Sequence, residues 1–139
     1  MNIEWVTSIA VIAADPAKSR RLYVDALGLP LEPDQGGDYF HSDQVGGTKH
    51  FGVWPLADAA RACFGTVEWP ADLPVPQVSI EFEVENVDAV AAAADELRDQ
   101  GFQVPHDARE EPWGQTVARL ISNEGSIVGI SYAPSQHTA

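Results

Sequence analysis

The chain has too few cysteines for a disulfide and no apolar run long enough for a membrane span. Cys63 is its only cysteine, so no disulfide can form within one chain, and a reducing, cytoplasmic location is expected. No apolar run approaches the roughly 20 residues of a transmembrane helix. The first residues lack the basic segment of a signal peptide and already alternate as a strand does. We therefore expect a single domain over residues 1–139, without membrane contact.

Basic residues are also scarce. The sequence has 8 Lys and Arg against 21 Asp and Glu, for a net charge of −13. Binding to nucleic acid or to an anionic membrane requires basic patches, so neither is an expected partner. An acidic protein attracts cationic ligands by electrostatic steering, although the same charge also serves solubility.

The first half of the chain predicts a β-α-β-β-β unit. Asp15-Pro16 is a helix N-cap followed by proline at the first helical position, and Gly28 suits the residue just past the helix end. The predicted elements are a strand over 5–12, a helix from Asp15 to Gly28, and short strands over 30–33, 38–42 and 48–54. A short helix over 56–64 and a proline-rich linker follow.

The second half repeats this order. Asn86 is placed as the cap of a helix that ends at Gly101, at nearly the spacing of Asp15 and Gly28 in the first half. The predicted strands are 78–84, 102–105, 115–121 and 127–132. The expected divisions are a first module over 4–55, a linker with a short helix over 56–76, a second module over 77–134 and a tail over 135–139. Neither module closes a core alone, so the two pack together within one chain or are exchanged between the chains of a dimer.

This pattern resembles the vicinal oxygen chelate superfamily, which includes glyoxalase I, extradiol dioxygenases, and fosfomycin and bleomycin resistance proteins. The resemblance is carried by "DPAKSRRLYVDALGL", "FEVENVDAVAAAADELRDQGFQV", Pro112-Trp113-Gly114 and Asn123-Glu124-Gly125. It implies an α+β fold in which two tandem βαβββ modules form a curled, cleft-enclosing mixed sheet with the helices outside.

Enzymes of this superfamily hold a divalent metal in the cleft, typically with His and Glu from the first and fourth strand of each module. The corresponding positions here are Ser8, Gly52, Ser79 and Gly129. Glycine has no side chain and a neutral serine hydroxyl is a poor ligand, so the residues argue against a metal site and against metal-dependent catalysis. No cofactor is expected, and whether the protein is an enzyme stays open. The small residues predict open space at the floor of the cleft.

Strand alternation extends this set of cleft residues, because every second residue shares a face. The predicted ligand-binding residues are Trp54, Trp113, Glu81, Glu83, His50, Ser8, Ser79, Gly52 and Gly129. Val6, Ala10 and Ile12 should share the face of Ser8, and Ile127 and Ser131 that of Gly129. Either Tyr39 and His41 or Phe40 and Ser42 should join them. The glutamates could equally be solvated on an open face, and the tryptophans could lie in the core or at a dimer interface.

The favoured interpretation is a metal-independent small-molecule binding protein, closest in character to the bleomycin resistance proteins. A homodimer would sequester a cationic or aromatic drug or metabolite, as in antibiotic resistance, in clefts completed by both chains. The alternative is a metal-dependent lyase, isomerase or dioxygenase with atypical ligands drawn from His41, His50, Glu81 and Glu83. A metal-free enzyme would use Glu81 or Glu83 as a general base. A third interpretation is a regulatory or scaffolding module whose cleft is filled by its own side chains.

Overall fold

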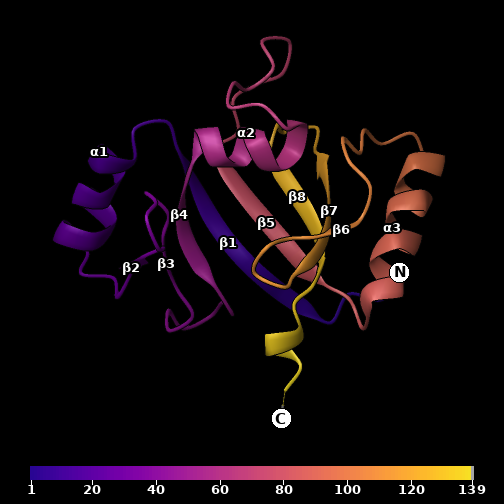
Figure 1. Cartoon of the computed structure of the whole chain (residues 1–139), viewed down its shortest axis with the longest axis horizontal. Helices are drawn as coiled ribbons and strands as arrows, with labels where there is room; N and C mark the ends of the chain where they lie inside the picture. Colours follow the sequence, from indigo (N-terminus) through magenta and orange to yellow (C-terminus); the bar gives the residue numbers. More distant parts are fainter. Residues whose placement is uncertain (139) are drawn as a thin grey trace.

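The computed structural model, which describes residues 1–138, forms one curled sheet flanked by helices (Figure 1). The sheet has eight strands in the order β2-β3-β4-β1-β5-β8-β7-β6. Their bounds are β1 Trp5–Ala13, β2 Glu32–Pro33, β3 Phe40–Ser42, β4 Phe51–Pro55, β5 Val78–Glu83, β6 Arg109–Glu110, β7 Thr116–Ile121 and β8 Ile127–Tyr132. The short strands β2 and β6 lie at the two edges, so the sheet is not closed into a barrel.

The two halves of the sheet have the same internal pairing. β1 pairs in parallel with β4 in the first half, as β5 does with β8 in the second. An antiparallel pairing between β1 and β5 joins the halves within one chain. This arrangement confirms the mixed, cleft-enclosing α+β fold of two βαβββ modules, whereas the residue numbers proposed as module boundaries stay predictions.

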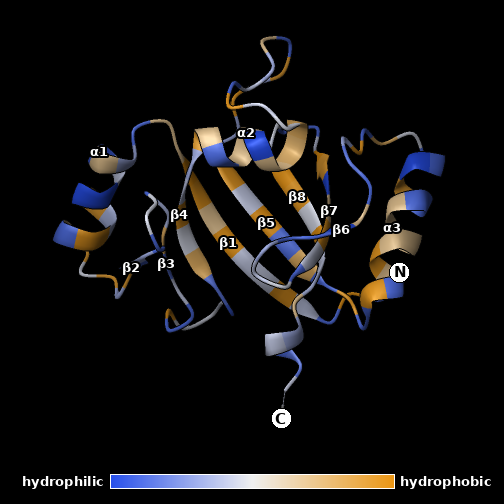
Figure 2. Ribbon diagram, viewed as in Figure 1, coloured by the Kyte–Doolittle hydropathy of each residue, from blue (hydrophilic) through white to orange (hydrophobic). Residues whose placement is uncertain are grey.

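Helices α1 and α3 cover the convex side of the sheet, one in each half (Figure 1). α1 spans Pro16–Arg20 and continues as a π-helical segment over Arg21–Ala26, and α3 spans Val87–Asp99. Both predicted caps are present: the Asp15 side chain accepts a hydrogen bond from the Lys18 N–H and the Asn86 side chain accepts one from the Ala89 N–H. Because side chains alternate along a strand, apolar residues face these helices while polar ones face the opposite side, and Figure 2 shows the alternation as bands along β1 and β5.

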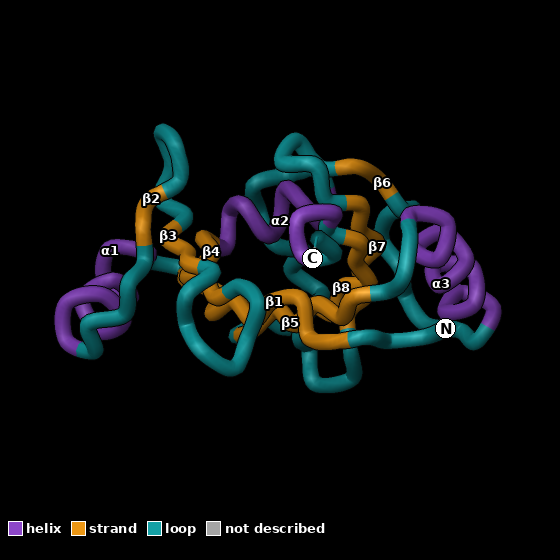
Figure 3. The backbone as a smooth tube through the Cα atoms, turned by 90° about the horizontal axis from the view of Figure 1, so that it is seen from below, coloured by secondary structure: helices purple, strands orange, loops and turns teal. Residues whose placement is uncertain are grey.

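Helix α2 (Leu56–Phe64) lies on the other side of the sheet. Figure 3 shows the outer strands of both halves rising on one side of β1 and β5, with α2 between them. Its Ala59 and Cys63 form a buried cluster with Ile127, against which Ile12 and Trp54 pack. The prediction of outside helices therefore holds for α1 and α3, whereas α2 covers one end of the concave face. No helix in the described part of the chain is long and apolar enough to cross a membrane.

Two local predictions were wrong. Residues 102–105 form no strand, and Val104 packs against the α3 cluster instead, while Pro105 has no N–H to donate to a ladder. β1 carries a bulge, because Val6 pairs with Phe82 while Ser8 pairs with the adjacent Glu81. The extra residue moves Val6 to the convex face, so Val6 does not share the face of Ser8 as predicted.

Candidate functional site

The two glycines at the floor of the concave face are covered by side chains of the chain itself. A Cβ atom built on Gly52 would lie 2.6 Å from the ring and hydroxyl of Tyr39. A Cβ atom on Gly129 would lie 2.8 Å from Cγ of Glu81. The prediction of open space at the floor was therefore wrong, because Tyr39 and Glu81 fill the volume that the missing side chains leave.

Glu81 is held at the floor by neutral hydrogen-bond donors. It is 8% exposed, and its Oε1 accepts hydrogen bonds from Ser8 Oγ at 3.3 Å and from Gln115 Nε2 at 2.9 Å. Gln115 Nε2 also donates to Ser131 Oγ at 2.8 Å. Within residues 1–138, no hydrogen bond reaches the second carboxylate oxygen, Oε2. Ser8 thus positions a carboxylate, and Glu81 presents one oxygen that is free to bind another group.

Trp113 links the rim of the concave face to this carboxylate. Its Nε1 donates a hydrogen bond to Gln115 Oε1 at 2.8 Å, and Gln115 in turn binds Glu81. Trp113 is 63% exposed, so most of its ring lies free at the surface. An exposed indole fixed by a hydrogen bond at its polar end provides a stacking surface at the rim.

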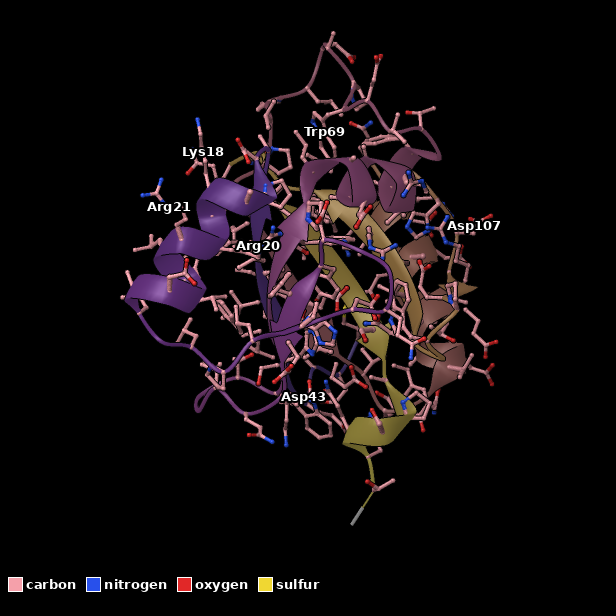
Figure 4. All side chains as sticks on the ribbon, turned by 60° about the vertical axis from the view of Figure 1, so that its left-hand side comes forward. Lys18, Arg20, Arg21, Asp43, Trp69 and Asp107 are labelled. Atoms are coloured by element: carbon pink, nitrogen blue, oxygen red, sulfur yellow. The ribbon has the colours of Figure 1, made fainter. Side chains whose placement is uncertain are left out.

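Tyr39 belongs to a hydrogen-bonded chain on the first-half side of the face. Its hydroxyl lies 2.7 Å from His50 Nε2, and His50 Nδ1 lies 2.5 Å from Asp43 Oδ1. Figure 4 labels Asp43 in the loop at the end of β3. An ionised carboxylate only accepts, so Nδ1 carries the proton and Nε2 accepts from the Tyr39 hydroxyl. Burial, reinforced by the negative charge of Glu81, raises the pKa of Tyr39, which keeps it a neutral phenol.

His41 stacks on Tyr39, with ring centroids 4.7 Å apart and an interplanar angle of 22°. Burial, with the nearby His50, lowers the pKa of His41 and favours a neutral ring. Phe40 packs on the opposite side, in the cluster under α1. Of the two pairs left open by the sequence, Tyr39 and His41 therefore face the concave side.

Glu83 differs from Glu81 in having both of its oxygens engaged. It is fully buried, and Thr7 Oγ1 donates to its Oε1 at 2.7 Å. Its Oε2 accepts from the backbone N–H of Ala133 at 2.5 Å and lies 2.7 Å from His137 Nε2. Glu83 thus anchors the C-terminal segment and has no oxygen left for a ligand, contrary to the prediction that it lines the site in the same way as Glu81.

Arg119 is a buried charge on the concave face that the sequence interpretation missed. Its side chain is 1% exposed, and Nη1 donates to Glu111 Oε1 at 3.0 Å and to the carbonyl of Ala62 at 3.5 Å. The guanidinium carbon lies 5.7 Å from the ring centre of Trp54, on the opposite wall. Its Nε is buried without a hydrogen-bond partner. The alternation of Gln115, Val117 and Arg119 along a predicted strand could have indicated this position.

The remaining predicted residues, Ser79 and Trp54, lie toward the α2 end of the face. Ser79 is 2% exposed and pairs with Ala10 and Ile127. Trp54 packs in the cluster beneath α2 and contacts the Arg119 guanidinium. Both therefore border the end of the concave face that α2 covers.

The residues do not fit a bound divalent metal. Among residues 1–138, no group of three or more His, Cys, Asp or Glu side chains is placed to hold a metal ion. His41 and His50 have ring centroids 5.1 Å apart, but Glu81 and Glu83 are held by different partners in separate networks. The structure does not assemble the atypical His and Glu ligands considered from the sequence, and Ser or Gly stands at the four positions where the resemblance would place metal ligands.

Two surface hollows lie away from this face. One, of about 420 Å³, is lined by residues 66–71, and the other, of about 320 Å³, lies where the N-terminal ends of α1 and α2 meet. Neither is lined by Tyr39, Glu81, Gln115 or Arg119. We place the candidate site on the concave face, because buried polar side chains converge there and not in the loop hollows.

The comparison with known sequences agrees with this architecture. The family described as Glyoxalase/Bleomycin resistance protein/Dioxygenase superfamily matches residues 5–126. The chain belongs to this superfamily. No curated protein matches the chain. Membership confirms the resemblance drawn from the sequence motifs.

Solved structures share the fold at low sequence identity. Methylmalonyl-CoA epimerase from Mycobacterium tuberculosis is 16% identical, with a TM-score of 0.61 over 99% of this chain and 93% of that chain. A superfamily member from Vibrio splendidus 12B01 is 11% identical, with a TM-score of 0.58 over 95% of this chain and 100% of that chain. A variant of methylmalonyl-CoA epimerase from Streptomyces coelicolor, in complex with 2-nitronate-propionyl-CoA, is 14% identical, with a TM-score of 0.60 over 99% of this chain and 100% of that chain. These likenesses show the fold alone.

Proposed function

We propose that the protein binds a small molecule on its concave face through Glu81, without a protein-bound metal ion. The observation that carries this proposal is the free Oε2 of a carboxylate that is only 8% exposed. Ser8 and Gln115 donate to the other oxygen and so fix the direction in which the free one points. A buried carboxylate with one free oxygen favours a ligand that brings a positive charge or a strong hydrogen-bond donor.

Aromatic rings surrounding this carboxylate suggest that the ligand also has a flat or aromatic part. Tyr39 and His41 stack on the first-half side, and the exposed ring of Trp113 lies at the rim. The net charge of −13 attracts cations to the protein as a whole. A cationic aromatic drug or metabolite fits these features, and binding without chemistry would sequester it.

A superfamily structure in complex with 2-nitronate-propionyl-CoA supports the general idea that this fold accommodates small molecules. Homodimer formation, a cytoplasmic location and a role in antibiotic resistance stay predictions. A dimer would be supported by sedimentation at twice the chain mass.

The hydrogen-bonded chain of Tyr39, His50 and Asp43 favours a second candidate, a metal-free enzyme that moves a proton. Tyr39 could accept a substrate proton while passing its own to His50, whose positive charge Asp43 would then balance. Turnover of a bound ligand that Tyr39→Phe abolishes without weakening binding would favour this candidate over simple sequestration.

Calorimetric titration with tryptamine, an aromatic amine, tests the binding proposal. We expect Glu81→Gln to weaken binding about 10- to 100-fold, because a charge-assisted hydrogen bond contributes about 1.5–3 kcal/mol. Glu85→Gln is the matched control, since Glu85 is exposed and the substitution changes the net charge equally.

Equal weakening by both variants would assign the effect to the overall charge and contradict a specific role for Glu81. Elemental analysis of the untagged protein provides an independent check. Stoichiometric zinc, nickel, manganese or iron would overturn the metal-independent mechanism.

A further inference from the structure

We infer that Glu81 and Arg119 together bind the two charged ends of a compact zwitterion, with its ammonium group at Glu81 and its carboxylate at Arg119. This inference rests on the proposed function and narrows the ligand to aromatic amino acids and molecules that carry the same two charges. Arg119 would then form a second subsite, for an anion, beside the carboxylate of Glu81.

The sheet register places the two charges on either side of a glycine. Gly129 in β8 pairs with Glu81 in β5 and with Arg119 in β7. Directly paired residues share one face of a sheet, so both side chains belong to the concave face. Neighbouring strands lie about 4.8 Å apart, which separates the two backbones by roughly 10 Å. Glu81 bends over Gly129, so that its Oε2 lies 3.3 Å from where a Gly129 Cβ atom would stand, and Val117 Cγ2 lies 3.4 Å from the same point. The free carboxylate oxygen is therefore directed across β8 toward the strand of Arg119, and a ligand would lie above these side chains.

The two charges are not neutralised by each other. Within residues 1–138, the ion pairs of Arg119 and Arg109 are both made with Glu111, and none joins Arg119 to Glu81. Two guanidinium groups sharing one carboxylate leave one net positive charge. Glu81, bound by the neutral side chains of Ser8 and Gln115, leaves one net negative charge. A zwitterion matches this distribution, whereas a simple cation or anion matches only half of it.

Arg119 also has a donor that nothing in the described chain satisfies. Its Nε is buried without a hydrogen-bond partner, although Nη1 donates to Glu111 and to the carbonyl of Ala62. Buried polar groups are nearly always hydrogen-bonded, so an unsatisfied one requires an explanation. A ligand carboxylate would supply the acceptor and would form a charge-assisted hydrogen bond with the guanidinium group.

The aromatic rings near Glu81 and Arg119 indicate that the ligand also carries an aromatic side chain. The Arg119 guanidinium carbon lies 5.7 Å from the ring centre of Trp54, and the ring of Tyr39 covers Gly52 on the first-half side of the same face. A side chain attached between an ammonium and a carboxylate group would contact these rings. This arrangement is that of an aromatic α-amino acid.

Three probes with one shared indole ring separate the contributions. Tryptophan carries both charges, tryptamine only the ammonium group, and indole-3-propionate only the carboxylate. In calorimetric titrations of the wild-type protein, we expect tryptophan to bind at least about tenfold more tightly than either single-charge probe, as one additional charge-assisted hydrogen bond implies.

A substitution at Arg119 tests which residue holds the carboxylate. Arg119→Gln should bring the ratio of tryptophan to tryptamine affinity to about one, because only tryptophan uses the guanidinium group. Arg61→Gln is the control, since Arg61 is an exposed arginine on α2 and its loss should leave the ratio unchanged.

The outcomes distinguish this inference from the proposed function. If tryptamine binds as tightly as tryptophan and Glu81→Gln weakens both, the zwitterion inference fails and the proposed function stands. If none of the three probes binds, the zwitterion inference and the proposal of an aromatic ligand at Glu81 both fail. If Arg119 serves only to hold α2 through Ala62, Arg119→Gln will lower stability while leaving the affinity ratio intact. Should that variant not fold, the three-probe comparison on the wild-type protein still decides.

Discussion

At Gly52 and Gly129 the absence of a side chain leaves room for other side chains of the same protein. In each half a parallel pair of strands contributes one of these glycines, opposite Ala10 in the first half and opposite Glu81 in the second. Glu81 is long enough to cover its own glycine, whereas Ala10 is not. Tyr39 therefore reaches over Gly52 from before β3, and the two halves fill equivalent positions by different means.

We predict that Gly52→Ala lowers the free energy of unfolding by about 1–2 kcal/mol, because the added methyl group displaces Tyr39 and breaks its hydrogen bond to His50. The same substitution in a Tyr39→Ala background should be neutral or stabilising, since alanine suits an extended strand better than glycine does. Urea denaturation of the four proteins in this double-mutant cycle measures the coupling. Additive effects would show that Tyr39 does not occupy this space.

Cys63 is a buried residue whose thiol is not set up to react. Burial raises the pKa of its thiol to about 11, although the nearby Arg119 opposes the shift. The thiol is therefore protonated at neutral pH and packs as a small apolar group on the buried side of α2.

Among the elements, α2 determines which part of the concave face stays accessible. Its apolar side covers Ile12, Trp54 and Ile127, and the carbonyl of Ala62 near its end accepts hydrogen bonds from Arg109 and Arg119. Positive groups at a helix C-terminus are favourable, because the last carbonyls are otherwise unpaired. The polar residues around Glu81 remain beyond the helix.

The two capped helices should differ in their sensitivity to loss of the cap. Asn86→Ala removes a hydrogen bond of 2.9 Å to the Ala89 N–H and should cost about 1 kcal/mol of unfolding free energy, because α3 buries three residues against the sheet. Asp15→Ala removes a longer bond of 3.3 Å from a helix with no buried residues and should cost less. Denaturation midpoints of the two variants give the comparison. A larger loss for Asp15→Ala would contradict this ranking.

At the scale of the whole molecule, the joint between the halves is reinforced by the segment after β8. A 3₁₀ turn over Pro134–Gln136 brings His137 against buried Glu83 of β5. The Trp5 ring of β1 packs against His137 at an interplanar angle of 42°, and its Nε1 donates a hydrogen bond to Gln136 Oε1. The last residues described thus tie together the two strands that join the halves.

We predict that His137→Ala lowers the unfolding free energy by about 1–3 kcal/mol, because a fully buried carboxylate loses one of its partners. Thr138→Ala changes an exposed neighbour and should be nearly neutral. Thermal unfolding of both variants tests the prediction. Equal melting temperatures for the two variants would mean that the tail does not stabilise the joint.

The elements follow from local patterns in the sequence. Alternation along "VSIEFEV" predicts a strand whose apolar side meets a helix, and the residues 56–64 and 127–132 predicted for α2 and β8 match the observed bounds. The caps Asp15 and Asn86 mark the repeat of the β-α-β-β-β order, which carries the superfamily resemblance. These features depend on residues close together in the chain, so they can be read from one sequence.

The roles of the polar side chains depend on tertiary contacts. Glu81 and Glu83 are two residues apart in one strand, yet their roles differ. Gln115 binds only one oxygen of Glu81 and leaves the second available, whereas His137 from the C-terminal segment helps to enclose Glu83. A bulge near Ser8 changes which residues share its face, and Arg119 gains its position from pairing across β8. By itself the sequence determined the repeated β-α-β-β-β order and the small residues where the resemblance would place metal ligands. Only the tertiary structure decided which side chains fill that space, because each of them reaches it from a different strand or loop.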